Sequence, residues 1–312
     1  MFIKNFSQLS KADVALAGGK GASLGEMTGA KIPVPPGFVV LASAFDQFLK
    51  ETDLEQELMA QLKKINYQDV NSVDEHSNII RSLIAKALMP KGLAALITAE
   101  FKKLKAKFVA VRSSATAEDS SAASWAGELE TYLNTTDKTL LANVKKCWSS
   151  LFTPRAIFYR HEKKLLKTKV SVAVVVQQMV ASEISGIAFT VHPVTQDRNQ
   201  MIIEAGYGLG EAIVSGSITP DSYVIDKRDY SLIDVNVASQ GRKIVKGPAG
   251  GVKWAPVTAP VGAKQKLNGR LIVDLAKICS KIEKHYKFPC DIEWAYCGAK
   301  FYITQSRPIT TL

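Results

Sequence analysis

The sequence has few cysteines and none of the cysteine spacings that bind zinc. Only four occur in 312 residues, and no two of them form a CxxC pair. This excludes a disulfide framework or a zinc site as the organising feature of the fold. The pattern is typical of reduced thiols, and we expect a cytoplasmic protein. The four are Cys147, Cys279, Cys290 and Cys297.

Long apolar runs are also lacking. The longest, such as residues 170–176, are far too short to cross a bilayer. Residues 1–5 show neither the start of a long apolar segment nor the cleavage site of a signal peptide. We therefore expect no signal peptide and no membrane partner.

Acidic residues are outnumbered by basic ones, 29 to 40, which gives a net charge of +11. Excess positive charge favours anionic partners such as a nucleotide, phosphate, nucleic acid or an acidic protein surface. The most basic stretches, residues 102–107 and 163–169, mix lysine with leucine at helical spacing, as solvated helix faces do. No nucleic-acid-binding motif accompanies them, so we expect no nucleic-acid partner. A nucleic-acid binder stays an alternative that rests on net charge alone.

What is present indicates an ordinary globular protein of more than one lobe. Hydrophobic residues make up 46% of the chain and charged residues 22%. Apolar residues recur at helical spacing over 43–105, with a break at 90–92, and again over 140–165 and 268–286. Runs between them, such as the β-branched segment 172–180, predict strands, and residues 240–262 predict a loop or irregular hairpin. We therefore expect an α+β fold.

Three glycines surround Lys20 within residues 13–27. Such a backbone can approach a phosphate closely while the lysine supplies a point charge. The segment is not a P-loop, because Gly21 stands where Ser or Thr is needed and Val14 stands where a glycine is needed. A glycine-rich turn with a surface lysine is the alternative.

An apolar run at residues 108–111 leads into Arg112 and then into small hydroxyl and acidic residues. A guanidinium at a strand end can bind a phosphate through two hydrogen bonds. The donor-rich segment 120–127 is typical of a lid over phosphates. Alternatively, Arg112 pairs with Glu118 or Asp119 in a plain strand-to-loop connection.

The β-branched run ends in Gln177, Gln178 and Met179. Backbone groups at this point could read an adenine edge while Met179 packs on the ring. A buried strand that simply ends is the alternative. A later glycine cluster has a spacing like GxGxxG, but it is weak evidence for a dinucleotide site because no βαβ repeat follows. Its members are Gly206, Gly208, Gly210 and Gly216.

Two alternating runs, residues 291–294 and 301–308, predict a closing hairpin. Residues two apart in a strand share a face. A three-residue loop at 298–300 would place Glu293 opposite Gln305 and Asp291 opposite Arg307, whereas a two-residue loop would put the pairs on opposite faces. Two carboxylates, an amide carbonyl and a guanidinium on one face suit a divalent cation and the phosphates it carries. A solvated strand edge with a cross-strand ion pair is the alternative.

Together these blocks resemble one family, the ATP-binding domain of phosphoenolpyruvate synthase, pyruvate phosphate dikinase and rifampicin phosphotransferase. The resemblance spans almost the whole chain in the family's order, and the combination of motifs is highly specific. It implies an ATP-grasp fold, with two α/β lobes that clasp a nucleotide and have approximate extents of 1–170 and 171–312. The motifs that carry it are Gly18-Gly19-Lys20-Gly21-Ala22-Ser23-Leu24-Gly25-Glu26, Val34-Pro35-Pro36-Gly37-Phe38, Val111-Arg112-Ser113-Ser114-Ala115-Thr116-Ala117-Glu118-Asp119, Gln178-Met179, Gly208-Leu209-Gly210-Glu211, Pro220-Asp221, Asp291-Ile292-Glu293-Trp294 and Gln305-Ser306-Arg307-Pro308.

The resemblance also implies roles at matching positions. Lys20 and Arg112 would bind the ATP phosphates, and with Arg307 they would be the catalytic side chains. Asp291 would complete the phosphate end with Arg307, and the segment 121–127 would be the lid. The work of such residues is to position the reactants and neutralise charge.

The remaining implied contacts are to adenine, to other parts of the nucleotide and to the metal. Gln178 and Met179 would hold adenine, and Glu293 and Gln305 would ligate magnesium. Thr116 and Glu211 complete the expected nucleotide contacts. The cofactors implied are therefore ATP and Mg2+.

One departure from the family matters. Its members pass the phosphoryl group through a histidine on a separate swivelling domain, in a Thr-Ser-His setting, and no such segment is present. His192 lacks that setting and is expected at a strand end. The acceptor-binding domain is absent as well. We expect an excised domain, a truncated product or a subunit of a split enzyme, whose partner is a phosphohistidine-carrying domain in cis or in trans.

The implied activity is that of an ATP-dependent phosphotransferase module that cleaves ATP to AMP and phosphorylates a carrier histidine. Phosphoenolpyruvate synthase, with pyruvate as acceptor, is the first expectation for the parent enzyme. Rifampicin phosphotransferase, with a rifamycin as acceptor, is the second. A non-catalytic ATP-binding regulatory module is the alternative from another class, against which an intact set of site residues argues. That set is Lys20, Arg112, Glu293, Gln305 and Arg307.

Overall fold

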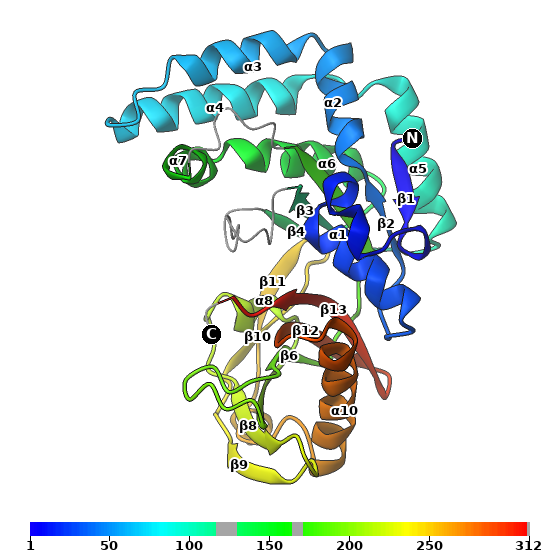
Figure 1. Cartoon of the computed structure of the whole chain (residues 1–312), viewed down its shortest axis with the longest axis vertical. Helices are drawn as coiled ribbons and strands as arrows, with labels where there is room; N and C mark the ends of the chain where they lie inside the picture. The colour runs from blue at the N-terminus through cyan, green and yellow to red at the C-terminus, as the bar shows by residue number, and fades with distance from the viewer. Residues whose placement is uncertain (117–129, 164–170, 311–312) are drawn as a thin grey trace. The chain divides into compact units, whose positions relative to one another are not determined.

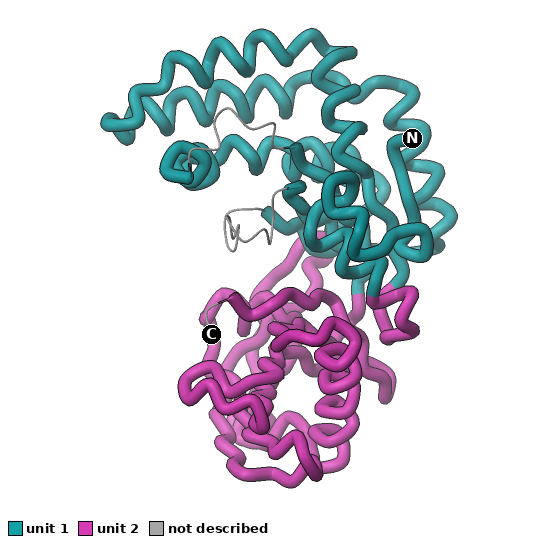
Figure 2. The backbone as a smooth tube through the Cα atoms, viewed as in Figure 1, with its two compact units in different colours: residues 1–26, 36–179 teal, residues 27–35, 180–312 magenta. Residues whose placement is uncertain are grey.

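The computed structural model describes residues 1–116, 130–163 and 171–310. They form two compact units, shown in Figure 2. The first comprises Met1–Glu26 and Pro36–Met179, and the second Met27–Pro35 and Val180–Leu312. The sequence predicted a boundary between the lobes at about 170/171, whereas the first unit of the structure extends to Met179. Residues 27–35 join the second unit, where the Pro33 carbonyl accepts a hydrogen bond of 2.9 Å from the Ile303 N–H.

A five-stranded sheet of order β1-β2-β5-β3-β4 organises the first unit, and every neighbouring pair is antiparallel. Its central strand β5 is buried from Val172 to Gln177, as its β-branched composition predicts for a strand covered on both faces. The strands are β1 (Ile3–Asn5), β2 (Gly37–Val40), β3 (Val109–Ala115), β4 (Thr131–Thr135) and β5 (Val172–Gln178).

Helices cover one face of this sheet (Figure 1). They bury their aromatic side chains against alternate valines of the strands, so that Phe48 and Trp148 pack in one core with Val111 and Val174. The rings of Phe48 and Trp148 lie 5.0 Å apart. The helices are α2 (Ala42–Glu51), α3 (Leu54–Lys63), α4 (Val70–Lys86), α5 (Lys91–Lys103), α6 (Leu140–Ser149), η3 (Ser150–Phe152) and α7 (Pro154–Glu162).

The region 43–105, expected to be helical with one break, contains four helices. The expected break at 90–92 is present, since α5 begins at Lys91. A second break follows α2, where the Thr52 hydroxyl donates back to the Phe48 carbonyl at 2.7 Å and Asp53 adopts a left-handed φ of 54°. A third precedes α4, which Asp69 caps by accepting from a backbone N–H. The hydrogen bonds of Thr52 and Asp69 compete with the backbone hydrogen bonds that would continue a helix. They do not alter the spacing of the apolar residues, so that spacing did not reveal these two breaks.

The glycine-rich segment around Lys20 is helical. The helix α1 (Val14–Gly29) follows the short turns η1 (Phe6–Gln8) and η2 (Lys11–Asp13) and is interrupted at Gly18, whose φ is 69°. A Cβ on Gly21 would meet Val39 of β2, whose neighbours in the strand, Phe38 and Val40, face the helical core. The helix α1 therefore covers the second face of the sheet.

The second unit contains a six-stranded antiparallel sheet of order β13-β12-β6-β7-β8-β9. The predicted helix after Asn268 is α10 (Gly269–Tyr286), which Asn268 caps. This helix buries the stripe Ile272, Leu275, Cys279 and Ile282. The strands are β6 (Ile184–Phe189), β7 (Gln200–Tyr207), β8 (Asp221–Asp226), β9 (Leu232–Asn236), β12 (Cys290–Cys297) and β13 (Lys300–Pro308).

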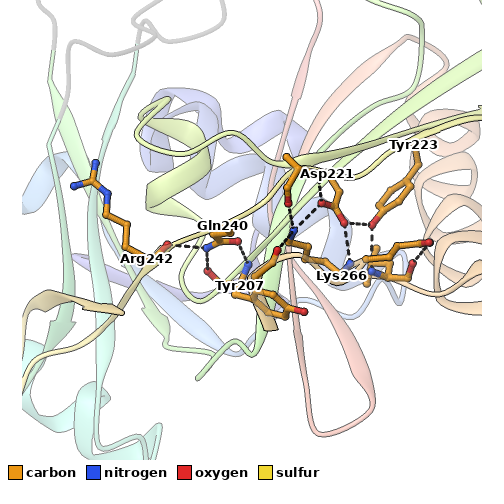
Figure 3. A network of polar contacts seen from close by, with 10 residues as sticks. Tyr207, Asp221, Tyr223, Gln240, Arg242 and Lys266 are labelled. Carbon is orange, nitrogen blue, oxygen red and sulfur yellow. Dashed lines mark hydrogen bonds and ion pairs between the residues drawn. The ribbon is translucent and has the colours of Figure 1, made fainter. Parts of the chain in front are cut away.

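A separate two-stranded hairpin, β10 (Arg242–Lys246) and β11 (Val252–Pro256), confirms the hairpin expected between 240 and 262. Figure 3 shows the polar network at its base. The Gln240 side chain accepts from the Tyr207 N–H at 2.8 Å and donates to the Tyr207 carbonyl at 3.0 Å. Short helices α8 (Glu211–Val214) and α9 (Ala259–Gly262) flank the hairpin in sequence.

The same network explains the Pro220-Asp221 motif. Asp221 and Lys266 form an ion pair of 2.8 Å with both side chains fully buried (Figure 3). Asp221 also accepts from the Tyr223 hydroxyl at 2.7 Å and from the Lys266 N–H at 2.8 Å. Because each carboxylate oxygen has partners within the fold, the aspartate anchors the chain around β8.

None of the helices within the described residues is long and apolar enough by itself to span a membrane. An adjoining pair, α4 and α5, satisfies the length and composition criteria together, but it is bent by 78°.

Candidate functional site

In the first unit, Lys20 and Arg112 belong to elements that pack on each other. A Cβ on Gly18 would lie 2.2 Å from the Ser114 hydroxyl oxygen and 2.4 Å from its carbonyl oxygen, so only glycine permits this approach of α1 to β3. The Gly21 N–H donates to the same hydroxyl at 3.3 Å. Since Arg112 lies two residues before Ser114 in β3, its side chain belongs to the sheet face that α1 covers.

Arg112 is buried and directed along the sheet toward β5. Only 7% of the residue is exposed, and its Nη1 donates to the side-chain Oε1 of Gln177 at 3.5 Å. The Gln177 Nε2 is buried, and no residue that the structure describes accepts a hydrogen bond from it. Buried polar groups are normally paired, so an amide donor without an acceptor beside a guanidinium indicates a place for an acceptor-rich group such as phosphate. The register of β3 and β5 pairs Ala110 with Gln177. Arg112, two residues after Ala110, is therefore a diagonal neighbour of Gln177 on the same face of the sheet.

Gln178 and Met179, the residues expected at adenine, follow Gln177 at the end of β5. Their N–H groups are engaged, to the Pro36 carbonyl at 2.8 Å and the Phe108 carbonyl at 3.1 Å. Alternation places the Gln178 side chain on the sheet face opposite to Gln177. Contact with adenine would therefore use carbonyl oxygens and side chains at this position.

Thr116 is tied to the start of β5. Its hydroxyl donates to the Ser171 carbonyl at 3.1 Å and accepts from the Ser171 N–H at 3.3 Å. The expected lid, 121–127, and the alternative partners of Arg112, Glu118 and Asp119, lie outside the described residues.

In the second unit, the closing hairpin β12–β13 pairs the expected residues, but its loop is shorter than expected and its register shifts once. Glu293 lies opposite Gln305, and Asp291 lies opposite Arg307. The loop has two residues and not three, since Cys297 pairs with Lys300, and the register shifts by one residue between Glu293 and Trp294. Thr304 has no residue opposite it and forms a β-bulge. This extra residue offsets the shorter loop, so that both polar pairs lie on one face.

Arg307 and Asp291 form a bidentate contact through one carboxylate oxygen, with distances of 2.8 Å from Nε and 2.7 Å from Nη2. The Asp291 side chain is 13% exposed and that of Arg307 40%. Burial raises the pKa of Asp291, Arg307 lowers it, and the charge on Glu293 adds a smaller rise. The arginine thus supports an ionised carboxylate in a poorly solvated place.

Glu204 of β7 joins this polar face, although it was not among the predicted site residues. Ile187 of β6 pairs with Glu293 on one side and with Glu204 on the other, which puts both glutamates in one row of the sheet. Burial raises the pKa of Glu204, and the charge on Asp291 raises it further. Glu204 therefore adds a third carboxylate to the face that carries Asp291, Glu293 and Arg307.

The remaining predicted residues lie elsewhere. Glu211 is exposed and begins α8, directly after a turn held by a 2.6 Å hydrogen bond from the Ser185 hydroxyl to the Gly208 carbonyl. His192 follows β6, and its Nδ1 accepts from the N–H groups of Val194 and Thr195 at 3.3 and 3.2 Å. The imidazole therefore caps a turn after a strand, as expected.

Comparison with known proteins identifies what these motifs have in common. The family model described as pyruvate phosphate dikinase, AMP/ATP-binding domain, matches residues 14–312. A probable phosphoenolpyruvate synthase of Methanocaldococcus jannaschii is 45% identical over 318 residues, covering 100% of this chain and 27% of that protein. The phosphoenolpyruvate synthase of Pyrococcus furiosus is 41% identical over 358 residues, covering 100% of this chain and 44% of the relative.

A rifampicin phosphotransferase of Bacillus subtilis is 37% identical over 308 residues, covering 98% of this chain and 35% of that protein. The chain thus spans less than half the length of these curated relatives. The match of the family model to nearly the whole chain shows that the protein belongs to the pyruvate phosphate dikinase AMP/ATP-binding domain family.

Proposed function

We propose that this chain is an ATP-grasp module that binds Mg-ATP, cleaves it and passes a phosphoryl group to a carrier histidine on another domain or chain. The observation that carries the proposal is the register of β12 and β13, which sets Glu293 opposite Gln305 and Asp291 opposite Arg307 on one polar face. Metal ligands and a phosphate-binding guanidinium are the parts that phosphoryl transfer requires.

The donor set fits magnesium. A carboxylate and an amide carbonyl face each other across the hairpin at Glu293 and Gln305, and oxygen is the donor that this ion prefers. Within the described part of the chain, no group of three or more His, Cys, Asp or Glu could hold a metal by itself. Phosphate oxygens and water would complete the coordination, as is usual for this ion. Bound magnesium would offset negative charge on the phosphates.

The chain's own residues would position the nucleotide. Arg112 and Gln177 offer donors beneath the glycine-rich helix that carries Lys20. Arg307, which pairs with Asp291 and is 40% exposed, is proposed to contact a phosphoryl group. Fixed donors that meet charge as it develops lower the barrier without a covalent role for the protein. Gln178, Met179, Thr116 and Glu211 are proposed to contact the rest of the nucleotide.

For the whole enzyme we favour phosphoenolpyruvate synthase, which converts ATP, pyruvate and water to phosphoenolpyruvate, AMP and phosphate. The names of the relatives at 41 to 45% identity support this choice. A rifampicin phosphotransferase is the second candidate, because a relative with that name matches the same residues at 37%. A non-catalytic ATP-binding module is the alternative from another class.

The test supplies a carrier histidine on a separate domain. The purified chain is mixed with a histidine-bearing domain from one of the longer relatives and with radiolabelled ATP. We expect labelled phosphohistidine and AMP; formation of ADP alone would overturn the synthase-type reaction. ATP binding without turnover would favour the non-catalytic module. Pyruvate and a rifamycin, offered in turn with the full-length parent, then distinguish the two enzymes.

A further inference from the structure

The hydrogen bonds at the two ends of the β10–β11 hairpin show which of its backbone groups point outward. The Gly247 N–H donates to the Gly251 carbonyl at 3.0 Å, and the Val257 N–H donates to the Gly241 carbonyl at 2.9 Å. Opposite residues of an antiparallel ribbon alternate between hydrogen-bonded and non-bonded pairs. With the observed register, the bonded pairs fall at odd-numbered positions. The N–H and carbonyl groups of the even-numbered residues therefore point away from the ribbon.

One outer edge of the hairpin is used by the fold, and the other is open. On the β10 side, the Ile244 carbonyl accepts from the Leu209 N–H at 2.9 Å. On the β11 side, the outward groups belong to Val252 and Trp254, and no third strand of the described chain joins this ribbon. Val252 is 40% exposed and Trp254 42%. An open edge of this kind can accept an extended segment of another protein as a further strand.

The odd-numbered face of the hairpin is positively charged. It carries Lys243, which is half-buried, and Lys253, which is exposed. No Asp or Glu occurs in the chain between Asp234 and Asp274, so the hairpin itself offers these lysines no carboxylate. Lysine beside a strand edge discourages pairing with an arbitrary segment. Complementary charge favours an acidic one.

The even-numbered face carries an aromatic anchor. The Arg242 guanidinium lies over the Trp254 ring, 4.2 Å from its centroid. Arg242 is held in turn, because its carbonyl accepts from the Gln240 side chain at 3.0 Å (Figure 3) and its Nη2 donates to the Ser217 carbonyl at 3.4 Å. Tryptophan and arginine are enriched among the residues that dominate binding energy. Their stacking orders both side chains before a partner arrives, which lowers the entropy cost of binding.

We infer that the outer edge of β11 binds an extended acidic segment of a partner protein by β-strand addition. The backbone of the segment pairs with Val252 and Trp254, its carboxylates lie on the face of Lys253, and its apolar side chains lie on the face of Trp254. Outward amide donors and carbonyl acceptors favour a peptide over a nucleic acid, whose backbone offers no amide groups. The inference does not depend on the proposed function, because it rests on the edge and the charge of the hairpin.

The test measures binding of short labelled peptides to the whole chain by fluorescence anisotropy. In the first peptide, glutamate alternates with valine and threonine. The second has lysine in place of glutamate, and the third is the first with every backbone nitrogen methylated, which removes the donors that strand addition needs. We expect the acidic peptide to bind at least about tenfold more tightly than either of the others.

Two variants locate the binding surface. Lys253→Glu should weaken binding of the acidic peptide by at least about tenfold, because it reverses the charge beside the open edge. Lys284→Glu makes the same change of charge at an exposed position of α10 and should keep most of the affinity. If Lys253→Glu does not fold, the comparison of the three peptides on wild type and the amide exchange of wild type decide.

Hydrogen exchange of the Trp254 backbone amide distinguishes strand addition from charge attraction. In the 15N-tryptophan-labelled chain this NMR signal is assigned by Trp254→Phe, and saturating acidic peptide should slow its exchange by at least about tenfold. Failure of the acidic peptide to bind, equal binding of its methylated form, or unchanged exchange would overturn the inference. It would also be overturned by single-stranded DNA that binds more tightly than the acidic peptide and loses affinity in Lys253→Glu.

Discussion

Glu293 lies directly opposite Gln305 across the β12–β13 hairpin, although the loop that joins the strands has only two residues. If both bind magnesium, Glu293→Gln should weaken Mg-ATP binding by at least about tenfold, or about 1.4 kcal/mol. Because the positions face each other, the exchange Glu293→Gln with Gln305→Glu restores one carboxylate and one amide. It should recover part of the affinity, measured by calorimetry.

Binding of ATP without magnesium is the control for the exchange. It should change little in either variant, because the metal ligands do not contact the base. Equal loss of affinity with and without magnesium would mean that this pair acts on the nucleotide and not on the ion.

Removing the guanidinium of Arg307 should weaken Mg-ATP binding by roughly 10- to 100-fold, the range of one or two charge-assisted hydrogen bonds. It also removes the charge that opposes the rise of the Asp291 pKa caused by burial, so Asp291 should take up a proton more easily. Arg307→Lys should recover little, because lysine lacks the planar fork. Calorimetry and the carboxyl NMR signal of Asp291 check the two outcomes.

Arg228→Ala is a matched control in the same unit. Arg228 pairs with Asp226 at 2.5 Å, but its side chain is 74% exposed. This variant should bind Mg-ATP like wild type. If both Arg307→Ala and Glu293→Ala also bind like wild type, the closing hairpin is not the phosphate end.

The raised pKa values of Glu204 and Asp291 predict a stability that falls as pH rises. Burial raises both, so the folded chain keeps protons that the unfolded chain releases above about pH 4. By linkage, the free energy of unfolding decreases as pH rises from the unfolded through the folded pKa. Glu204→Gln removes one such group. At pH 7 without magnesium this variant should unfold at a higher urea concentration than wild type, and the difference should vanish toward pH 4.

Urea denaturation across this pH range checks the effect of Glu204. Asp234→Asn, at an exposed position of β9 in the same unit, should show no comparable change of slope. A Glu204→Gln variant whose stability tracks wild type at every pH would show that the glutamate is well solvated.

Gly18→Ala should destabilise the first unit by about 1–3 kcal/mol. The new Cβ would overlap Ser114, and the φ of 69° at this position is unfavourable for alanine. Gly92→Ala, in α5, has no atom within 4 Å of the new Cβ and should be neutral or stabilise by up to about 1 kcal/mol. Urea denaturation of both variants makes the comparison; equal values would refute close packing of α1 on β3.

Breaking the buried pair at one end should be costly. Asp221→Asn leaves the Lys266 ammonium buried without its counter-charge and should destabilise the second unit by about 3–5 kcal/mol. The exposed pair Arg270–Asp274, at 3.8 Å, provides the control: Asp274→Asn should cost less than about 1 kcal/mol. A similar cost for both variants would mean that Asp221 is not a structural anchor.

The closing hairpin shows how far the sequence could go. Alternation is local, so the faces of Asp291, Glu293, Gln305 and Arg307 could be read directly, and the pairing was predicted correctly. The three-residue loop was wrong. The turn uses Gly298 and Ala299, both at positive φ, and alanine gives no sign of that conformation. The compensating bulge at Thr304 lies in the pairing of β13 with β12 and could not be seen in the alternation.

Two site residues were not predicted as such because their significance lies in their neighbours. Gln177 matters because register places it beside Arg112, some 65 positions away in the chain. Glu204 matters because β6 sets it in one row with Glu293. Neither residue has a distinctive sequence signal, since a polar residue near a strand end is common.

The sequence by itself determined the α+β class, the family and the polar face of the closing hairpin, because composition, motif order and alternation are properties of the chain read in order. Only the tertiary structure decided that Asp221 is a buried anchor, that Glu204 shares the face of Asp291, and that Arg112 lies beside Gln177. Burial and charge pairing depend on which distant segments meet, and that is fixed by strand register and packing.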